Sequence, residues 1–174
     1  LFALFGLTAF SAPYPGTSSS LMTNPEKGFF YGNQGFRLGT LNSKWLLNSA
    51  DSNLQIRYSN SESDTASLVV KTDDLILPLS LDLYAKKWMK DYYNYEFIVL
   101  GTRTFMENQT RGMVVDLMNK EKDKQIRQVI YLKDKKAVII TCSDTTKSFL
   151  TTLPQCNQLI KNFSWLEATT PTKL

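Results

Sequence analysis

The sequence contains no histidine, and this single absence removes several classes of enzyme and metal site. Without an imidazole there is no Ser-His-Asp or Cys-His catalytic arrangement, no HExxH zinc site and no histidine-based metal centre. The glycines match neither the dinucleotide-binding pattern GxGxxG nor the phosphate-binding pattern GxxxxGK[ST]. We therefore predict a protein that is not an enzyme and that carries no cofactor.

The sequence also lacks an apolar run of the roughly 20 residues that a membrane-spanning helix requires. Residues 1–12 (LFALFGLTAFSA) are apolar and end in small residues, which is typical of the second half of a secretory signal peptide. Cleavage after Ser11 or Ala12 would start the mature chain near Pro13. The alternative is a short buried strand or a membrane anchor. We expect a periplasmic or secreted protein without stable membrane insertion of the mature chain.

Composition predicts one globular domain after this segment. The chain is 43% hydrophobic and 21% charged, which are ordinary values for a folded protein. Residues 13–27 are rich in Pro, Ser, Thr and Gly and predict a flexible leader, whereas residues 167–174 form a polar tail. The single domain is expected to span residues 28–166.

Only two cysteines are present, and they have no CxxC spacing. In an exported protein an even number of cysteines favours a disulfide. Cys142 ends a predicted strand and Cys156 lies in the predicted helix that follows it. We predict a Cys142–Cys156 bridge, and the alternative is a pair of free buried thiols.

The net charge of +4 is modest, but the basic residues are unevenly placed. Residues 120–136 hold seven basic and three acidic side chains, an excess equal to that of the whole chain. Such a patch would suit an acidic partner or a phospholipid surface. The alternative is that its lysines only keep two exposed hairpin turns soluble. The candidate partner-binding residues are Lys120, Lys122, Lys124, Lys133, Lys135 and Lys136.

Hydrophobic periodicity gives the order of the elements. Apolar residues at i, i+3, i+4 and i+7 predict an amphipathic helix over residues 81–92, which Ser80 can cap. A second helix is expected over 147–163, with a kink or a fresh start at Pro154. Strands are predicted at 35–41, 54–58, 66–71, 97–106, 111–118, 124–132 and 135–142. The last four of these form an antiparallel meander, so we predict an α+β fold with helices covering a curved antiparallel sheet of about seven strands.

Several of these segments resemble the PsbP-like superfamily. They are Gly35-Phe36-Arg37-Leu38 followed by Trp45, the helix at 81–92, Arg111 to Val115, the hairpin of 129–132 and 137–141, and Ile160 to Trp165. Most of residues 35–165 is covered, although the proline usual before the early tryptophan is replaced by Asn42-Ser43-Lys44. The resemblance is to the bacterial periplasmic, DcrB-like branch. It implies a non-enzymatic α-β-α sandwich that binds or assembles partners.

Carboxylates and aromatic residues add few candidates for a site. Asp73 and Asp74 are adjacent and point apart in an extended chain, so they are not a catalytic pair. The acidic loop at 60–64 lacks the EF-hand spacing, so we predict no metal site. The three tryptophans are expected in the core. The tyrosines that end the first helix, Tyr92, Tyr93 and Tyr95, are candidates to line a cleft.

Three functional hypotheses follow. The first is an exported binding or assembly module that contacts an unknown protein or envelope component through the sheet face or the basic turns. A second is a small-ligand or lipid carrier with an apolar pocket between sheet and helices. The third is a hydrolase with an unrecognised carboxylate site. Nucleic acid is not expected as a partner, because the basic residues are not interleaved with exposed aromatic residues.

Overall fold

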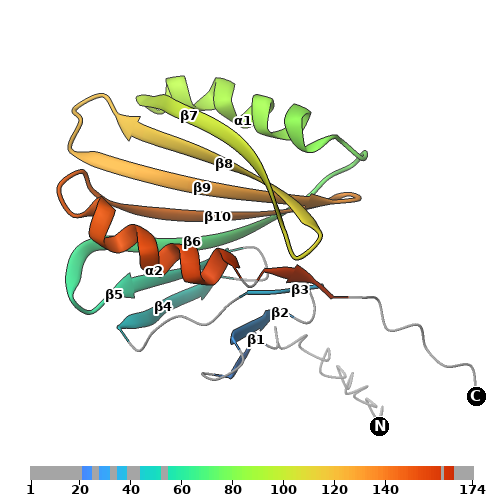
Figure 1. The fold of residues 1–174 in the computed structure, drawn as a ribbon, viewed down its shortest axis with the longest axis horizontal. Coiled ribbons are helices and arrows are strands. Elements are labelled where there is room, and N and C mark those ends of the chain that lie inside the picture. The colour runs from blue at the N-terminus through green and yellow to red at the C-terminus, as the bar shows by residue number, and fades with distance from the viewer. Residues whose placement is uncertain are drawn as a thin grey trace, which may run out of the picture.

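The computed structural model describes residues 21–24, 28–31, 35–38, 44–51, 55–161 and 163–166. These residues form the predicted α+β sandwich (Figure 1). The main sheet has seven strands: β4 (Trp45–Asp51), β5 (Gln55–Asn60), β6 (Ser63–Asp74), β7 (Phe97–Glu107), β8 (Thr110–Asn119), β9 (Lys124–Lys133) and β10 (Lys136–Thr145). The helices are α1 (Leu81–Asn94) and α2 (Phe149–Lys161). The predicted signal-peptide remnant, residues 1–12, and the predicted polar tail, 167–174, lie outside the described residues.

The main sheet has the strand order β4-β5-β6-β10-β9-β8-β7, and every neighbouring pair is antiparallel. Strands β7 to β10 form the meander that the sequence predicted. The chain leaves β6 through α1 and starts the meander at the far edge of the sheet, so that β10 returns beside β6 (Figure 1). This route leaves β4 and β7 as the two edge strands.

Side chains of the central strands alternate between two hydrophobic cores, one on each face of the sheet. Val114 and Val129 face α2, whereas their neighbours Val115 and Ile130 face α1. Successive side chains of a strand point to opposite faces, so a sheet covered on both faces needs apolar residues at consecutive positions. This explains the consecutive apolar residues within the meander strands, such as Met113 to Val115 of β8 and Val129 to Leu132 of β9.

Helix α1 begins where the sequence predicts and ends two residues later, at Asn94. The hydroxyl of Ser80 accepts a hydrogen bond from the amide of Leu83 at 3.2 Å, which caps the first turn. Asp82 lies in that turn, where its charge favours the helix dipole. The buried face carries Leu81, Tyr84, Ala85 and Tyr92, and Trp88 packs beside them.

Helix α2 runs through Pro154 as one helix, so the alternative of a fresh start there is wrong. Proline removes one backbone hydrogen bond, but α2 has strong support from the sheet. Cys142 of β10 and Cys156 lie at disulfide distance, with Cα atoms 6.2 Å apart. The buried carboxylate of Asp144 accepts hydrogen bonds from the hydroxyls of Thr65 and Thr152, which connects β6, β10 and α2.

The structure corrects the sequence prediction near the start of the domain. The predicted strand at 35–41 is described only as β3 (Phe36–Arg37), which pairs outside the main sheet. That smaller sheet has the order β1-β2-β3-β11 and consists of β1 (Leu21–Asn24), β2 (Gly28–Tyr31), β3 and β11 (Ser164–Trp165). Four residues of the predicted flexible leader, 13–27, therefore form a strand, because β1 pairs with β2. The edge strand β4 was not predicted.

Candidate functional site

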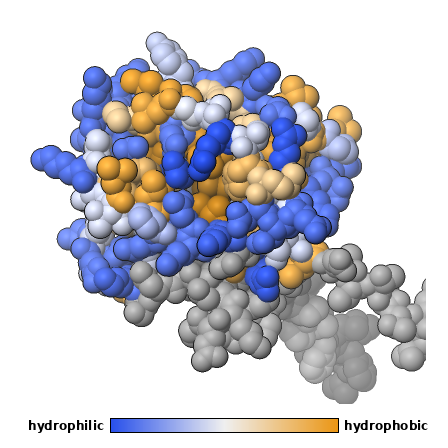
Figure 2. Space-filling model, in the orientation of Figure 1, coloured by the Kyte–Doolittle hydropathy of each residue, from blue (hydrophilic) through white to orange (hydrophobic). Residues whose placement is uncertain are grey.

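A pocket of about 310 Å³ lies between α2 and strands β7, β8 and β9. We call it the α2 pocket. Helix α2 packs against β10, β6 and β9, so part of the same sheet face remains open towards the β7 edge. Figure 2 shows the pocket as a hollow near the centre of the view, with an apolar floor and hydrophilic side chains around it.

The floor of the α2 pocket is apolar. It is formed by Phe105 of β7, Val114 of β8, Val129 of β9 and Ile160 of α2. Phe105 and Val114 lie on adjacent strands and on the same face, as the period of two requires. These side chains give a ligand an apolar surface that is already formed in the folded chain.

A glycine makes room for this floor. Gly112 lies opposite Phe105 in the β7–β8 pair and has no side chain beneath the phenyl ring. A Cβ atom at Gly112 would lie 2.5 Å from Cζ of Phe105 and 2.9 Å from Cε1 of Tyr131. Both distances are shorter than carbon atoms tolerate, so the position of Phe105 depends on the glycine.

An aromatic cluster next to the pocket supports the ring of Phe105. The ring of Tyr131 stacks on Phe163 with centroids 3.7 Å apart, and Phe105 meets Tyr131 edge-on at 5.8 Å. The Tyr131 hydroxyl donates to the carbonyl oxygen of Ile160 at 3.2 Å, at the end of α2. Burial raises the pKa of Tyr131, so it stays a neutral donor. Tyr131 therefore connects Phe105 of the sheet to the end of α2.

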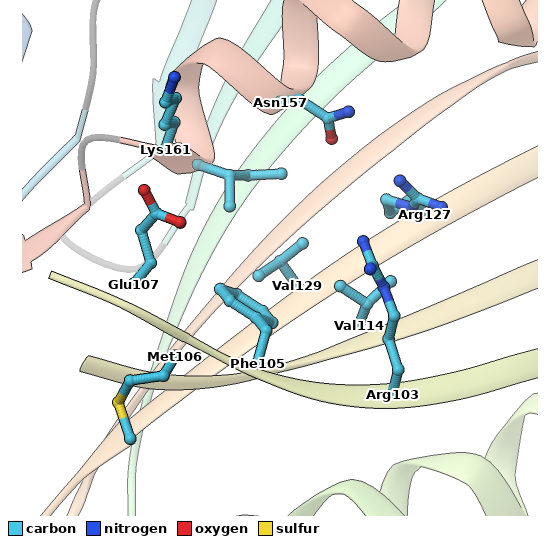
Figure 3. Close-up of a pocket in the computed structure, with 10 residues that line it drawn as sticks. Arg103, Phe105, Met106, Glu107, Val114, Arg127, Val129, Asn157 and Lys161 are labelled. Carbon is cyan, nitrogen blue, oxygen red and sulfur yellow. The ribbon is translucent and has the colours of Figure 1, made fainter. Parts of the chain in front are cut away.

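The rim of the pocket is polar. In Figure 3 the guanidinium of Arg103 points towards that of Arg127, and Asn157, Lys161 and Glu107 stand around the rest of the opening. Arg127 holds Asp116 in a two-point ion pair, with N–O distances of 2.7 and 2.9 Å. Within the described part of the chain, the guanidinium of Arg103 has no such partner.

The electrostatic balance of the rim favours an anion near the arginines. Asp116 neutralises Arg127 but leaves the charge of Arg103 uncompensated. Glu107 lies towards the other end of the opening, near Lys161 (Figure 3). The pocket therefore combines an apolar floor, one available guanidinium and one amide, which suits a ligand with a single anionic group and an apolar body.

The structure does not bring the six candidate lysines together. Lys120, Lys122 and Lys124 surround the turn between β8 and β9, whereas Lys133, Lys135 and Lys136 surround the turn between β9 and β10. These turns lie at opposite ends of β9, a strand of ten residues that spans about 33 Å. Lys136 pairs with Asp74 at 3.3 Å, and Lys120 lies over the ring of Tyr93. A single basic patch is therefore not formed.

The remaining candidates lie away from the α2 pocket. Asp73 accepts a hydrogen bond from Tyr84 at 2.9 Å, whereas Asp74 pairs with Lys136, so the adjacent carboxylates have separate partners. Tyr92 lies on the buried face of α1 and its hydroxyl donates to Gln128. Tyr93 and Tyr95 are exposed, so the three tyrosines do not share one surface, and none of them lines the α2 pocket.

The structure also locates the tryptophans and the metal-binding side chains. Trp45 is buried, and Trp88 and Trp165 pack against the two cores. The indole of Trp45 donates to Gln155 of α2 at 2.9 Å. In the described segments, no three acidic or cysteine side chains gather into a metal-binding group. No helix among those segments is both long and apolar enough to cross a membrane.

Sequence reasoning missed the residues of the α2 pocket. Arg103, Phe105 and Glu107 alternate along β7 and therefore share one face, which a period of two could have revealed. The contribution of α2 had no sequence signal, because it depends on where the helix lies across the sheet. Asn157 and Lys161 read as ordinary polar positions of an amphipathic helix.

Comparison with known proteins identifies the fold. No family model matches the chain, and no curated protein matches it in sequence. The solution structure of the cyanobacterial PsbP protein CyanoP from Synechocystis sp. PCC 6803 aligns with a TM-score of 0.61 and 8% identity, over 77% of this chain and 88% of that one. A Pseudomonas aeruginosa protein of unknown function aligns with a TM-score of 0.51 and 14% identity, over 77% and 85%. The DcrB-like branch stays a prediction, but the chain has the PsbP-like fold.

Proposed function

We propose that this chain is a non-enzymatic binding module of the cell envelope, periplasmic or secreted, that holds an anionic amphipathic ligand in the α2 pocket. The observation that carries the proposal is the uncompensated guanidinium of Arg103 beside a preformed apolar floor. This is the carrier hypothesis of the sequence analysis, with an anionic group added to the ligand. The cysteine pair supports an oxidising compartment.

Arg103 provides the principal recognition. Arg127 already uses two of its donors on Asp116, which also orients its guanidinium next to the opening. An anionic headgroup could then bond Arg103 and the amide of Asn157 while remaining beside a second cation. Hydrogen bonds to charged groups are about twice as strong as neutral ones. Replacement of Arg103 by alanine should thus raise the Kd of an anionic ligand by roughly tenfold or more.

The geometry argues against the carboxylate hydrolase at this site. Asp116 pairs with Gly101 of β7, and Glu107 lies six residues further along the same strand, or about 20 Å away. A glycosidase needs its two carboxyl groups within about 10 Å of each other. Asp116 is in addition held by Arg127. The two acids nearest the pocket therefore cannot act together on one bond.

A pair of fluorescent probes tests the proposal. Anilinonaphthalenesulfonate is an anionic amphiphile, and phenylnaphthylamine is a similar apolar molecule without the charge. We expect Arg103→Ala to raise the Kd of the anionic probe about tenfold and to leave the neutral probe within about twofold of its original Kd. The control is Arg111→Ala, which removes an arginine of the same hairpin that pairs with Asp82 of α1 instead.

The probe results have clear contrary outcomes. Equal losses of anionic-probe binding in Arg103→Ala and Arg111→Ala would mean that only net charge matters. Unchanged binding in Arg103→Ala would remove the pocket as the site. Either result would mean that the protein is a binding module that holds no anionic ligand in the α2 pocket.

A second candidate function is assembly through protein contacts, which the edge strand β7 favours. Its residues Ile98, Val99 and Leu100 are exposed on an edge strand. Exposed edge strands can accept a further strand from a partner. If that partner is a second copy, sedimentation velocity will show a dimer that Leu100→Lys dissociates. A monomer at all concentrations would leave this candidate without support.

A further inference from the structure

The link between β6 and α1 carries a set of exposed apolar side chains that the α2 pocket does not explain. Ile76 is 89% exposed and Leu77 is 68% exposed. Leu79, before the helix, and Leu83, in its first turn, are also open to solvent. A contiguous exposed apolar group of this kind marks a surface that meets a partner or a lipid.

Both ends of the link are anchored, so its apolar residues are presented from a fixed base. The amide of Leu75 donates to the carbonyl oxygen of Lys135 at 2.6 Å, which ties the start of the link to the β9–β10 turn. The other end is held by the buried Leu81 and Tyr84 of α1. The link lies at the end of the molecule in Figure 1, and Figure 2 shows apolar surface at that edge.

Lysines flank the apolar link. Lys133 and Lys135 of the β9–β10 turn are exposed, and the same turn contains Asp134. Lys136 is paired with Asp74 beside the link. The turn therefore places three lysines beside the link, against the two carboxylates of Asp134 and Asp74.

Helix α1 adds positive charge on its outer face. Lys86 and Lys87 are exposed within the first two turns of the helix. The acidic side chain of that region, Asp82, is engaged by Arg111 at 3.1 Å. Cations thus lie on both sides of the link, one group from the sheet and one from the helix.

We propose that the β6–α1 link docks on the surface of an anionic lipid bilayer, inserting Ile76 and Leu77 below the headgroups. The lysines of the β9–β10 turn would then lie at the level of the phosphates. The apolar side chains of the link would contact the acyl chains, and the lysines of the turn would contact the phosphates, which is the order of these layers in a bilayer. This interaction is peripheral, involves no spanning helix, and is independent of the α2 pocket.

Vesicle sedimentation tests the docking surface with the full chain. The probes are vesicles of phosphatidylcholine mixed with phosphatidylglycerol, and vesicles of phosphatidylcholine alone. We expect the double variant Ile76→Ser/Leu77→Ser to lower the partition coefficient on the anionic vesicles at least tenfold. Lys133→Ala/Lys135→Ala should lower it about tenfold on anionic vesicles and change it little on neutral ones.

Matched controls make the result specific to the link. Leu150→Ser removes an exposed leucine from the start of α2 and should leave partitioning unchanged. The Ile76→Ser/Leu77→Ser variant should bind anilinonaphthalenesulfonate with an unchanged Kd, so failure of the pocket proposal and failure of this one are distinguishable. Residues 1–12 are present in every variant, and ratios between variants therefore report the link alone.

Two results would overturn the proposal. One is partitioning of Ile76→Ser/Leu77→Ser that equals that of Leu150→Ser. The other is absence of binding of the unchanged chain to anionic vesicles, which would indicate that the link meets a protein instead. Circular dichroism of the variants checks that the loss does not come from unfolding.

Discussion

Replacement of Gly112 by alanine should distort both the core and the α2 pocket. The new methyl group would lie 2.5 Å from the ring of Phe105 and 2.9 Å from that of Tyr131. Tyr131 is fixed by its stack on Phe163, so Phe105 must move, and the open side available to it is the pocket. Such overpacking costs about 1–3 kcal/mol of stability.

The matched control for this substitution is Gly101→Ala on β7. A Cβ atom at Gly101 would have no neighbour within 4 Å. Both variants gain a similar small stabilisation from reduced freedom of the unfolded chain, about 0.5–1 kcal/mol. The difference between them therefore isolates the contact, and we expect Gly112→Ala to be less stable than Gly101→Ala by about 1–3 kcal/mol.

Urea unfolding followed by tryptophan fluorescence measures this difference. The same two variants should also differ in probe binding, because a displaced Phe105 narrows the pocket. Gly112→Ala should weaken the anionic and the neutral probe alike, unlike Arg103→Ala, which acts on the anionic probe. Equal stabilities for the two glycine variants would refute the packing assigned to Phe105.

Three further outcomes are expected. Replacement of Cys142 and Cys156 by serine should lower the unfolding free energy by about 3 kcal/mol and the Tm by roughly 10 °C, as measured by calorimetry. Asp144→Ala should lower the unfolding free energy by about 3 kcal/mol in urea, and Asp144→Asn by less than half as much, because an amide oxygen can still accept. Burial raises the folded-state pKa of Tyr92 and Tyr131, so these tyrosines contribute stability that is complete below their unfolded pKa of about 10 and is lost as the pH rises above it. Tyrosinate absorbance should then increase in two steps, the second coinciding with unfolding; a single step near the ordinary pKa would contradict this burial.

The sequence predicted the parts of the fold that depend on local patterns. Helix α1 follows from six apolar positions at helical spacing and from the cap at Ser80. The meander follows from strands rich in apolar residues that are separated by polar turns. One of these turns contains Asp134, which has a left-handed backbone with φ of 54°. Strand β4 was missed because Asn48 and Ser49 interrupt its apolar pattern.

The site depends on long-range placement, which local patterns do not contain. Phe105 and Asn157 are more than 50 residues apart in the chain and meet only because α2 lies off-centre on the sheet. The sequence predicted that the six lysines lie in two hairpin turns. Their separation follows from β9, which carries Lys124 at its start and Lys133 at its end.

Nuclear magnetic resonance mapping of anilinonaphthalenesulfonate on the full chain tests the central claim most directly. We expect the backbone amide signals that move to belong to residues 103–107, 127–129 and 157–161, which surround the α2 pocket. Shifts confined to residues 75–83 would place the probe on the exposed link instead. That result, or an even spread of small shifts, would contradict a ligand site between α2 and the meander.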